Sequence, residues 1–228
     1  IVVCFNLFAF LPPSFGGTNA YLDPRSIAGQ ETMVKALAKR FANVSWIHWD
    51  LINEPSYAPL SKLWRTRPIG DESEKAAWRS WVAARHPNMS EGELRALWRV
   101  PERDVLAVPR DDDFTTAAVQ IDRRPRKARD FRELTEDAIT RWAATLRGAL
   151  RQAGGPTTLV TLGQDEGGIF ERATQQLMAP SLDYTAVHTW WKNDDLLWDG
   201  VVTKVIGKPS LHQETGLMRL EDLDGTPW

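Results

Sequence analysis

The sequence predicts an α/β fold, an incomplete (β/α)8 TIM barrel with about five of the eight strand–helix units. Short segments rich in β-branched and aromatic residues each run into polar or aromatic residues, and helical patterns separate them. Alternating strands and helices are typical of a parallel sheet. A closed barrel typically needs about 250 residues, whereas this chain has 228 and carries a long interruption within them. We therefore expect about three units to be missing and both ends to be cut from a longer protein.

The first strand and helix are predicted within residues 1–42. Residues 1–10 form a continuous apolar run, which is typical of a strand buried on both faces. Asp23 followed by Pro24 favours a helix start, because aspartate caps a helix and proline fits its first turn. An apolar stripe at helical spacing then continues to about Ala42.

The next predicted strand, residues 46–54, ends in Asn53 and Glu54. Pro55 has no backbone N–H and favours an extended conformation for Glu54, so we expect the strand to stop there. Barrels of this kind keep their chemistry at the carboxyl ends of the strands. Glu54 is therefore the first catalytic candidate, and a solvated loop carboxylate is the alternative.

Residues 56–127 interrupt the alternation and are interpreted as a helical insertion within a single partial barrel domain that spans 1–228. Residues 72–85 have a helical pattern, and Ser90 begins a second short helix with a capping-box sequence. A disordered linker is the alternative, but the tryptophans here count against it. The insertion could shape substrate access or serve as a surface for protein interaction.

The second half of the chain returns to the barrel pattern. Helices are expected at 128–153, 169–178 and 195–206, and strands at 157–162, 184–188 and 209–214. The first of these strands runs into Asp165 and Glu166, the second into Trp190 and Trp191, and the third ends in Glu214.

Composition limits the possible functions. The net charge of −2 gives no electrostatic case for binding nucleic acid or a membrane. The only cysteine, Cys4, excludes an internal disulfide and leaves the redox compartment open. Residues 1–11 are too short to span a bilayer and lack the basic start of a signal peptide, so localisation stays open. The 11 tryptophans favour a sugar site, although we expect at least half of them to pack in the interior.

Glu54 and Glu214 end two predicted strands that are far apart in the sequence. If these strands face each other across one barrel mouth, the two carboxylates form the pair that retaining glycoside hydrolysis requires. One carboxyl group must stay protonated near neutral pH, and the charge of its neighbour favours that state.

Three segments, in order, resemble the clan A glycoside hydrolases. Trp49-Asp50-Leu51-Ile52-Asn53-Glu54-Pro55 is similar to the acid/base motif of the fourth barrel strand. Val187-His188-Thr189-Trp190-Trp191 is similar to the sixth strand, and His212-Gln213-Glu214-Thr215-Gly216 to the nucleophile segment of the seventh. The chain looks most like family 5 and its neighbours, the cellulases, β-mannanases and β-galactosidase-like enzymes. The resemblance covers about strands three to seven.

This resemblance implies a retaining glycosidase that cleaves β-linked oligo- or polysaccharides without a cofactor. Glu54 would be the general acid/base and Glu214 the nucleophile. The resemblance places Asn53 at the sugar 2-hydroxyl and His188 in the −1 subsite. The full set of candidate carbohydrate-binding residues is Asn53, Asp165, Glu166, His188, Trp190 and Trp191. Carbohydrate is the only partner expected, with no nucleic acid, membrane or obligate protein partner.

Asp165 and Glu166 leave an alternative open at the end of the strand before His188. Either could bind a sugar hydroxyl or replace Glu214 as the nucleophile, or the glycine-flanked acidic pair could simply form a turn. We favour Glu214, because its surroundings match the nucleophile segment.

Two other classes of protein are weighed against the glycosidase. His48, Asp50, His188 and His212 could hold a metal in a barrel hydrolase, but no His-x-His or His-Glu-x-x-His spacing occurs, so we expect no metal. Trp190, Trp191 and Trp198 would suit a carbohydrate-binding or inactive relative. A partial barrel also exposes strand edges, so the chain is expected to self-associate or fold poorly alone.

Overall fold

The computed structural model describes residues 2–63, 65–100, 105–114, 125–165, 178–189, 197, 200, 201 and 203–215. Its centre is a parallel sheet in the order β1-β2-β3-β4-β5, the same as the chain order. The strands are β1 (Val3–Asn6), β2 (Ile47–Asn53), β3 (Val160–Asp165), β4 (Thr185–Thr189) and β5 (Ser210–Thr215). Parallel strands in sequential order, joined by helical crossovers, are the arrangement of a (β/α) barrel. The predicted fold class is confirmed.

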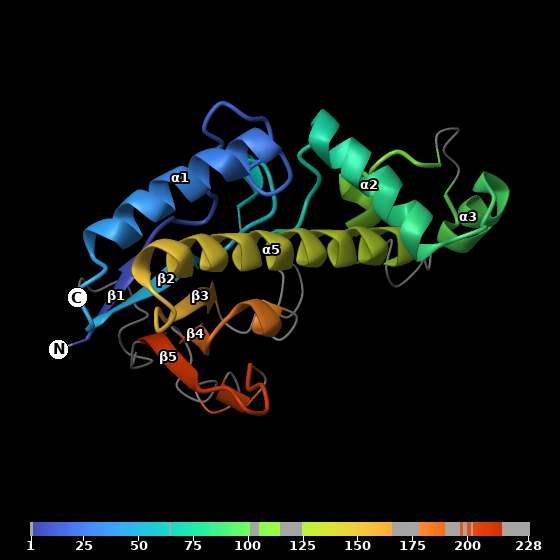
Figure 1. Cartoon of the computed structure of the whole chain (residues 1–228). Helices are drawn as coiled ribbons and strands as arrows, with labels where there is room; N and C mark the ends of the chain where they lie inside the picture. The colour runs from blue at the N-terminus through green and yellow to red at the C-terminus, as the bar shows by residue number, and fades with distance from the viewer. Residues whose placement is uncertain are drawn as a thin grey trace, which may run out of the picture.

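The sheet is curled into a half-barrel (Figure 1). Because of this curl, a side chain of the last strand contacts one of the first. Gln213 of β5 donates a hydrogen bond from Nε2 to Cys4 Sγ of β1 at 3.3 Å. The same amide nitrogen donates to Asp50 Oδ2 of β2 at 2.7 Å. Contact between the first and last strands of the described sheet requires this curvature.

Helices α1 (Pro24–Arg40) and α5 (Pro125–Gly154) cover one face of the sheet (Figure 1). Asp23 caps α1 as predicted, its side chain accepting from the backbone N–H of Arg25. The two helices pack along each other, and Trp142 Nε1 donates to Gln30 Oε1 in their buried interface at 2.5 Å. None of the described helices is long and apolar enough to cross a membrane.

The insertion packs against the amino-terminal part of α5 (Figure 1). It contains α2 (Glu72–Arg85), α3 (Glu91–Trp98) and the short 3-10 helices η1 (Leu60–Lys62) and η2 (Asp111–Phe114). The predicted capping box at Ser90 is present. Trp78 is fully buried and stacks on Trp98, with ring centroids 5.5 Å apart. These indoles therefore pack in the core, as expected for a share of the tryptophans.

The structure corrects three of the predicted elements. β1 is shorter than residues 1–10 and is half-exposed rather than buried on both faces, because in the described sheet it pairs only with β2. β3 begins at Val160 instead of residue 157, because a turn follows Gly155 and the backbone N–H of Thr158 bonds to the Gly155 carbonyl. Residues 203–206 are not helical.

Two predicted helices lie mainly outside the described residues. These are 169–178, of which the structure describes Met178, and the first part of 195–206. Met178 is followed by a short 3-10 helix, η4 (Ala179–Ser181), which packs on α5.

Candidate active site

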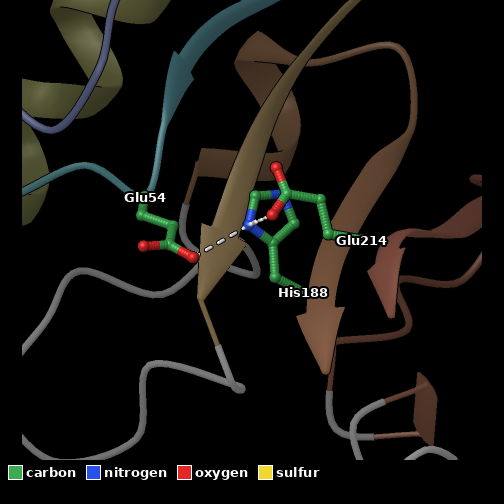
Figure 2. A group of neighbouring side chains, drawn as sticks. All are labelled: Glu54, His188 and Glu214. Atoms are coloured by element: carbon green, nitrogen blue, oxygen red, sulfur yellow. Dashed lines mark hydrogen bonds and ion pairs between the residues drawn. The ribbon is translucent and has the colours of Figure 1, made fainter. Parts of the chain in front are cut away.

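The carboxyl ends of β2, β3, β4 and β5 lie at one edge of the sheet, and they bring three of the predicted residues together. The register pairs His188 of β4 with Glu214 of β5 on one side and with Asp165 of β3 on the other. Figure 2 shows Glu54 just beyond β2, with its carboxylate pointing toward His188 and Glu214. Segments remote in the sequence therefore converge on one site.

His188 lies between the two carboxylates (Figure 2). Its Nδ1 is 3.2 Å from Glu54 Oε1 and 3.6 Å from Glu214 Oε2. One potential ligand atom from each of the three side chains lies within 4.8 Å of the other two. The His188 side chain is completely buried, whereas 14% of Glu54 and 36% of Glu214 are exposed. The carboxylates thus sit at the solvent side of a buried imidazole.

Glu54 has a left-handed backbone conformation, with φ +48°. The expectation that Pro55 holds Glu54 extended is therefore wrong, although the strand does end at Asn53. The backbone N–H of Glu54 donates to the Gly163 carbonyl of β3 at 2.8 Å, which fixes the turn of the chain. A non-glycine residue in this region is costly, and such residues concentrate at functional sites.

Gly163 gives His188 and Asp50 room to approach β3. A Cβ atom at this position would lie 2.8 Å from both His188 Nε2 and Asp50 Oδ2. Both distances are shorter than a van der Waals contact between non-bonded atoms, so any side chain here would displace buried groups. His188 Nε2 has no hydrogen-bond partner within the described part of the chain.

Asp50 is fully buried beneath the two carboxylates. Its Oδ1 accepts from the backbone N–H groups of Ile52 and Gly163, at 3.1 and 2.9 Å. Its Oδ2 accepts from Asn6 and Gln213, at 3.3 and 2.7 Å. Burial raises the pKa of Asp50, while the hydrogen bonds to its carboxylate and the nearby His188 partly offset the rise.

The four residues of the metal alternative do not form one cluster in the described structure. The ring of His48 bonds to the Tyr184 hydroxyl, and His212 Nδ1 lies 3.5 Å from Thr189 Oγ1. The Asp50 carboxylate accepts hydrogen bonds from two backbone N–H groups and from the Gln213 side-chain amide. Within the residues that the structure describes, the group able to hold an ion is Glu54, His188 and Glu214. These are the same side chains that a hydrolytic mechanism would use.

Of the remaining predicted site residues, the structure describes Asn53 and Asp165. Asn53 is the half-buried last residue of β2, and Asp165 is the last residue of β3 rather than part of a following loop. Glu166, Trp190 and Trp191 lie outside the described residues.

Gln213 and Gly163 both contribute to the site, and neither was predicted from the sequence to have a role there. A glycine where a strand-like run meets polar residues is the one sequence signal for Gly163. Gln213 has no such signal, because its importance depends on a contact with a distant strand.

Comparison with known proteins identifies the fold. No protein-family model matches the sequence, and no curated protein sequence matches it either. Among solved structures, a cold-adapted β-galactosidase from Rahnella sp. R3 matches over 78% of this chain and 25% of its own, with 19% identity and TM-score 0.56. A β-galactosidase from Bacillus circulans sp. alkalophilus matches over 77% of this chain and 25% of its own, with 15% identity and TM-score 0.55.

An exo-β-agarase matches more of the chain, 94% of it and 30% of the agarase, with 15% identity and TM-score 0.64. The chain thus spans about a quarter to a third of the length of these structures. At such identities the likeness concerns the fold, and the resemblance to family 5 stays a prediction. The chain therefore has the fold of part of a glycoside hydrolase barrel, with five parallel strands in a curled half-barrel.

Proposed function

We propose that the chain is part of the catalytic domain of a retaining glycoside hydrolase. The observation that carries the proposal is the approach of the Glu54 and Glu214 carboxylates, of which one oxygen each lies within 4.8 Å of the other. Retaining enzymes hold their two carboxyl groups about 5–5.5 Å apart, whereas inverting enzymes need about 6.5–9.5 Å to admit a water molecule. The spacing supports a direct attack on the sugar.

In the first step, a Glu214 oxygen attacks the anomeric carbon while Glu54 donates a proton to the departing glycosidic oxygen. The bond to the leaving group breaks, and a glycosyl ester forms on Glu214. In the second step, Glu54 takes a proton from a water molecule that attacks the same carbon. The ester bond breaks, and both carboxyl groups return to their starting states.

His188 would hold the geometry of this pair. With its proton on Nδ1, it donates toward Glu54 Oε1 and lies near Glu214 Oε2. Its ring is completely buried, so the surrounding side chains limit its movement. Asn53, the residue before Glu54, is proposed to bind the sugar 2-hydroxyl, and Asp165 to bind another hydroxyl from the neighbouring strand. The role proposed for Glu166, Trp190 and Trp191 is also carbohydrate binding.

The proposed substrate is a β-linked oligo- or polysaccharide. β-Galactosides are the first to test, because two of the structures with a similar fold are β-galactosidases. We treat 1–228 as one partial barrel domain and 56–127 as an insertion in it. The insertion packs on α5 through α2 and α3, which supports this division.

The experiment that tests the acid/base role compares two leaving groups in wild type and Glu54→Gln. Loss of the proton donor should lower kcat/KM by about 100-fold or more for an alkyl β-glycoside. The loss should be much smaller for a dinitrophenyl β-glycoside, whose leaving group needs no proton. Equal losses on both substrates would contradict acid catalysis by Glu54.

A carbohydrate-binding protein without catalysis is the second candidate, because the two carboxylates are partly exposed in front of a buried imidazole and could bind sugar hydroxyls. In that case Glu54→Gln and Glu214→Gln would alter sugar affinity, measured by calorimetry, and no variant or wild type would release product.

A further inference from the structure

β2, which ends just before Glu54, and β5, which carries Glu214, are both irregular close to these carboxylates. In β5, Val187 pairs with His212 and His188 pairs with Glu214, so Gln213 is an extra residue with no partner in β4. A bulge of this kind re-aims side chains that would otherwise alternate between the two faces. Gln213 reaches Asp50 inside the sheet, and Glu214 nevertheless approaches His188 from the same side.

The second irregularity lies in β2, between Asp50 and Asn53, where the register with β3 shifts. The Asp50 carboxylate occupies this place and accepts the backbone N–H groups of Ile52 and Gly163. These two donors are therefore satisfied by a side chain instead of a neighbouring strand. A buried N–H left without a partner is costly, so Asp50 stabilises the distorted end of β2.

One hydrogen bond joins the two irregularities. Gln213 Nε2 donates to Asp50 Oδ2 at 2.7 Å, although β3 and β4 separate their strands. Glu54 follows four residues after Asp50, and Glu214 directly follows Gln213. The bond is thus a buried link across the half-barrel beneath the two carboxylates, and it acts independently of the backbone ladder.

We propose that Asp50 and Gln213 are positioning residues, whose hydrogen bond fixes the separation of the Glu54 and Glu214 carboxylates. The inference rests on the proposed function, because that separation matters only if the two groups act as a pair. Neither residue touches the reacting atoms. Gly163 is part of the same arrangement, because a side chain there would meet Asp50 and His188.

The test compares Gln213→Ala with a matched control, Asn6→Ala. Both variants remove an amide donor from the same oxygen, Asp50 Oδ2, but only Gln213 connects it to the strand of Glu214. Crystal structures of wild type and both variants give the distance between the two carboxylates. We expect an increase of about 0.5 Å or more in Gln213→Ala and none in Asn6→Ala, since a bond of about 3 Å is lost across the sheet.

The pH dependence of kcat/KM adds a readout that a loss of stability alone would not move. When the charged nucleophile retreats, the general acid loses its proton more easily, so the alkaline limb should move to lower pH by about half a unit. Among the described side chains, His188 lies against both carboxylates, and the charge of Asp50 acts on His188 from within the sheet. Melting temperatures of both variants show whether each is folded.

An unchanged carboxylate separation and alkaline limb in folded Gln213→Ala would overturn the inference. So would equal changes in both variants. The crystallographic distance needs no turnover, so a wider pair in Gln213→Ala alone supports the inference even for a chain that hydrolyses no glycoside. Absence of hydrolysis by wild type would count against the proposed function alone.

Discussion

At the scale of residues, the site combines a strained backbone position with buried polar support. Glu54 has a positive φ, and its backbone is held by β3 while its side chain faces His188. Asp50 accepts hydrogen bonds from two backbone N–H groups at the irregular end of β2, those of Ile52 and Gly163. Such strain persists only where the surroundings determine the conformation. We therefore expect the positions of the two carboxylates to depend on Asp50 and on the turn at Glu54.

Gly163→Ala is expected to disrupt this support. The added Cβ would lie 2.8 Å from both Asp50 Oδ2 and His188 Nε2, which are buried and cannot move freely. We expect the free energy of unfolding to fall by about 1–3 kcal/mol, as is typical of overpacking. We also expect a lower kcat. Chemical denaturation provides the measurement.

Gly148→Ala is the control for that substitution. Gly148 lies inside α5, and a methyl group added there would meet no atom of another part of the described chain within 4 Å. Alanine should therefore stabilise the helix by about 0.5–1 kcal/mol. Equal stability changes of the two variants would contradict a packing role for Gly163.

The sequence predicted Glu54, His188 and Glu214 as site residues from their motifs and from the ends of their strands, and the structure places the three side chains close together. The sequence could not reveal the hydrogen bond between Gln213 and Asp50, because that contact depends on the register shifts in β2 and β5. Register is decided by the pairing of whole strands and not by local preference. The left-handed conformation of Glu54 was not predictable either, because a residue before proline generally prefers an extended backbone.

At the scale of elements, helix caps were predicted well, and so were the bounds of β2, β4 and β5, whereas those of β1 and β3 were not. Asp23 and Ser90 cap their helices as expected, because a cap is a local interaction between residues two or three positions apart. The β-branched segment that begins at residue 157 was predicted to be a strand from its first residue, but its first residues follow a turn and lie outside β3. Context overrides strand propensity more easily than it overrides a helix cap.

A pH-dependent contribution to stability is expected from α5. Burial raises the pKa of Glu136 to about 7, with Glu133 and Asp137 adding to the rise and Arg132 opposing it. The folded chain therefore holds this proton more tightly than the unfolded chain. Its contribution to stability is complete below pH 4.5, the ordinary value, and is lost as pH rises through about 7.

Glu136→Gln should abolish that loss. Relative to the variant, wild type is expected to lose about 1–2 kcal/mol of unfolding free energy between pH 4 and pH 8, a partial value because Glu136 is half-buried. Urea denaturation at both pH values provides the measurement, with Glu91→Gln at an exposed position of α3 as control. A wild-type curve parallel to that of Glu136→Gln would contradict the assignment.

At the scale of the whole molecule, the described sheet has two edges. β1 and β5 each pair with one neighbour in it, and both carry exposed apolar side chains, Val3 at 37% and Leu211 at 42%. Parallel order and curvature were predictable from the alternation of strands and helices. The contact between β1 and β5 side chains was not, because it depends on how far the sheet curls.

We expect these edges to pair with other copies of the chain. Sedimentation velocity over a range of concentrations should show a shift from monomer to larger species. Leu211→Lys should weaken the association, because a charge on an edge strand opposes pairing. A single monomeric species at all concentrations, with a sharp cooperative melt, would contradict this expectation.

Trapping the covalent intermediate would decide whether Glu214 and Glu54 act as nucleophile and acid/base on one sugar. The reagents are dinitrophenyl 2-deoxy-2-fluoro-β-glycosides, beginning with the galactoside, and peptide mass spectrometry locates the label. We predict one added fluoroglycosyl group on Glu214, and slower release of that group in Glu54→Gln. A label on Asp165, Glu166 or Glu54, or hydrolysis with no covalent label, would contradict these roles.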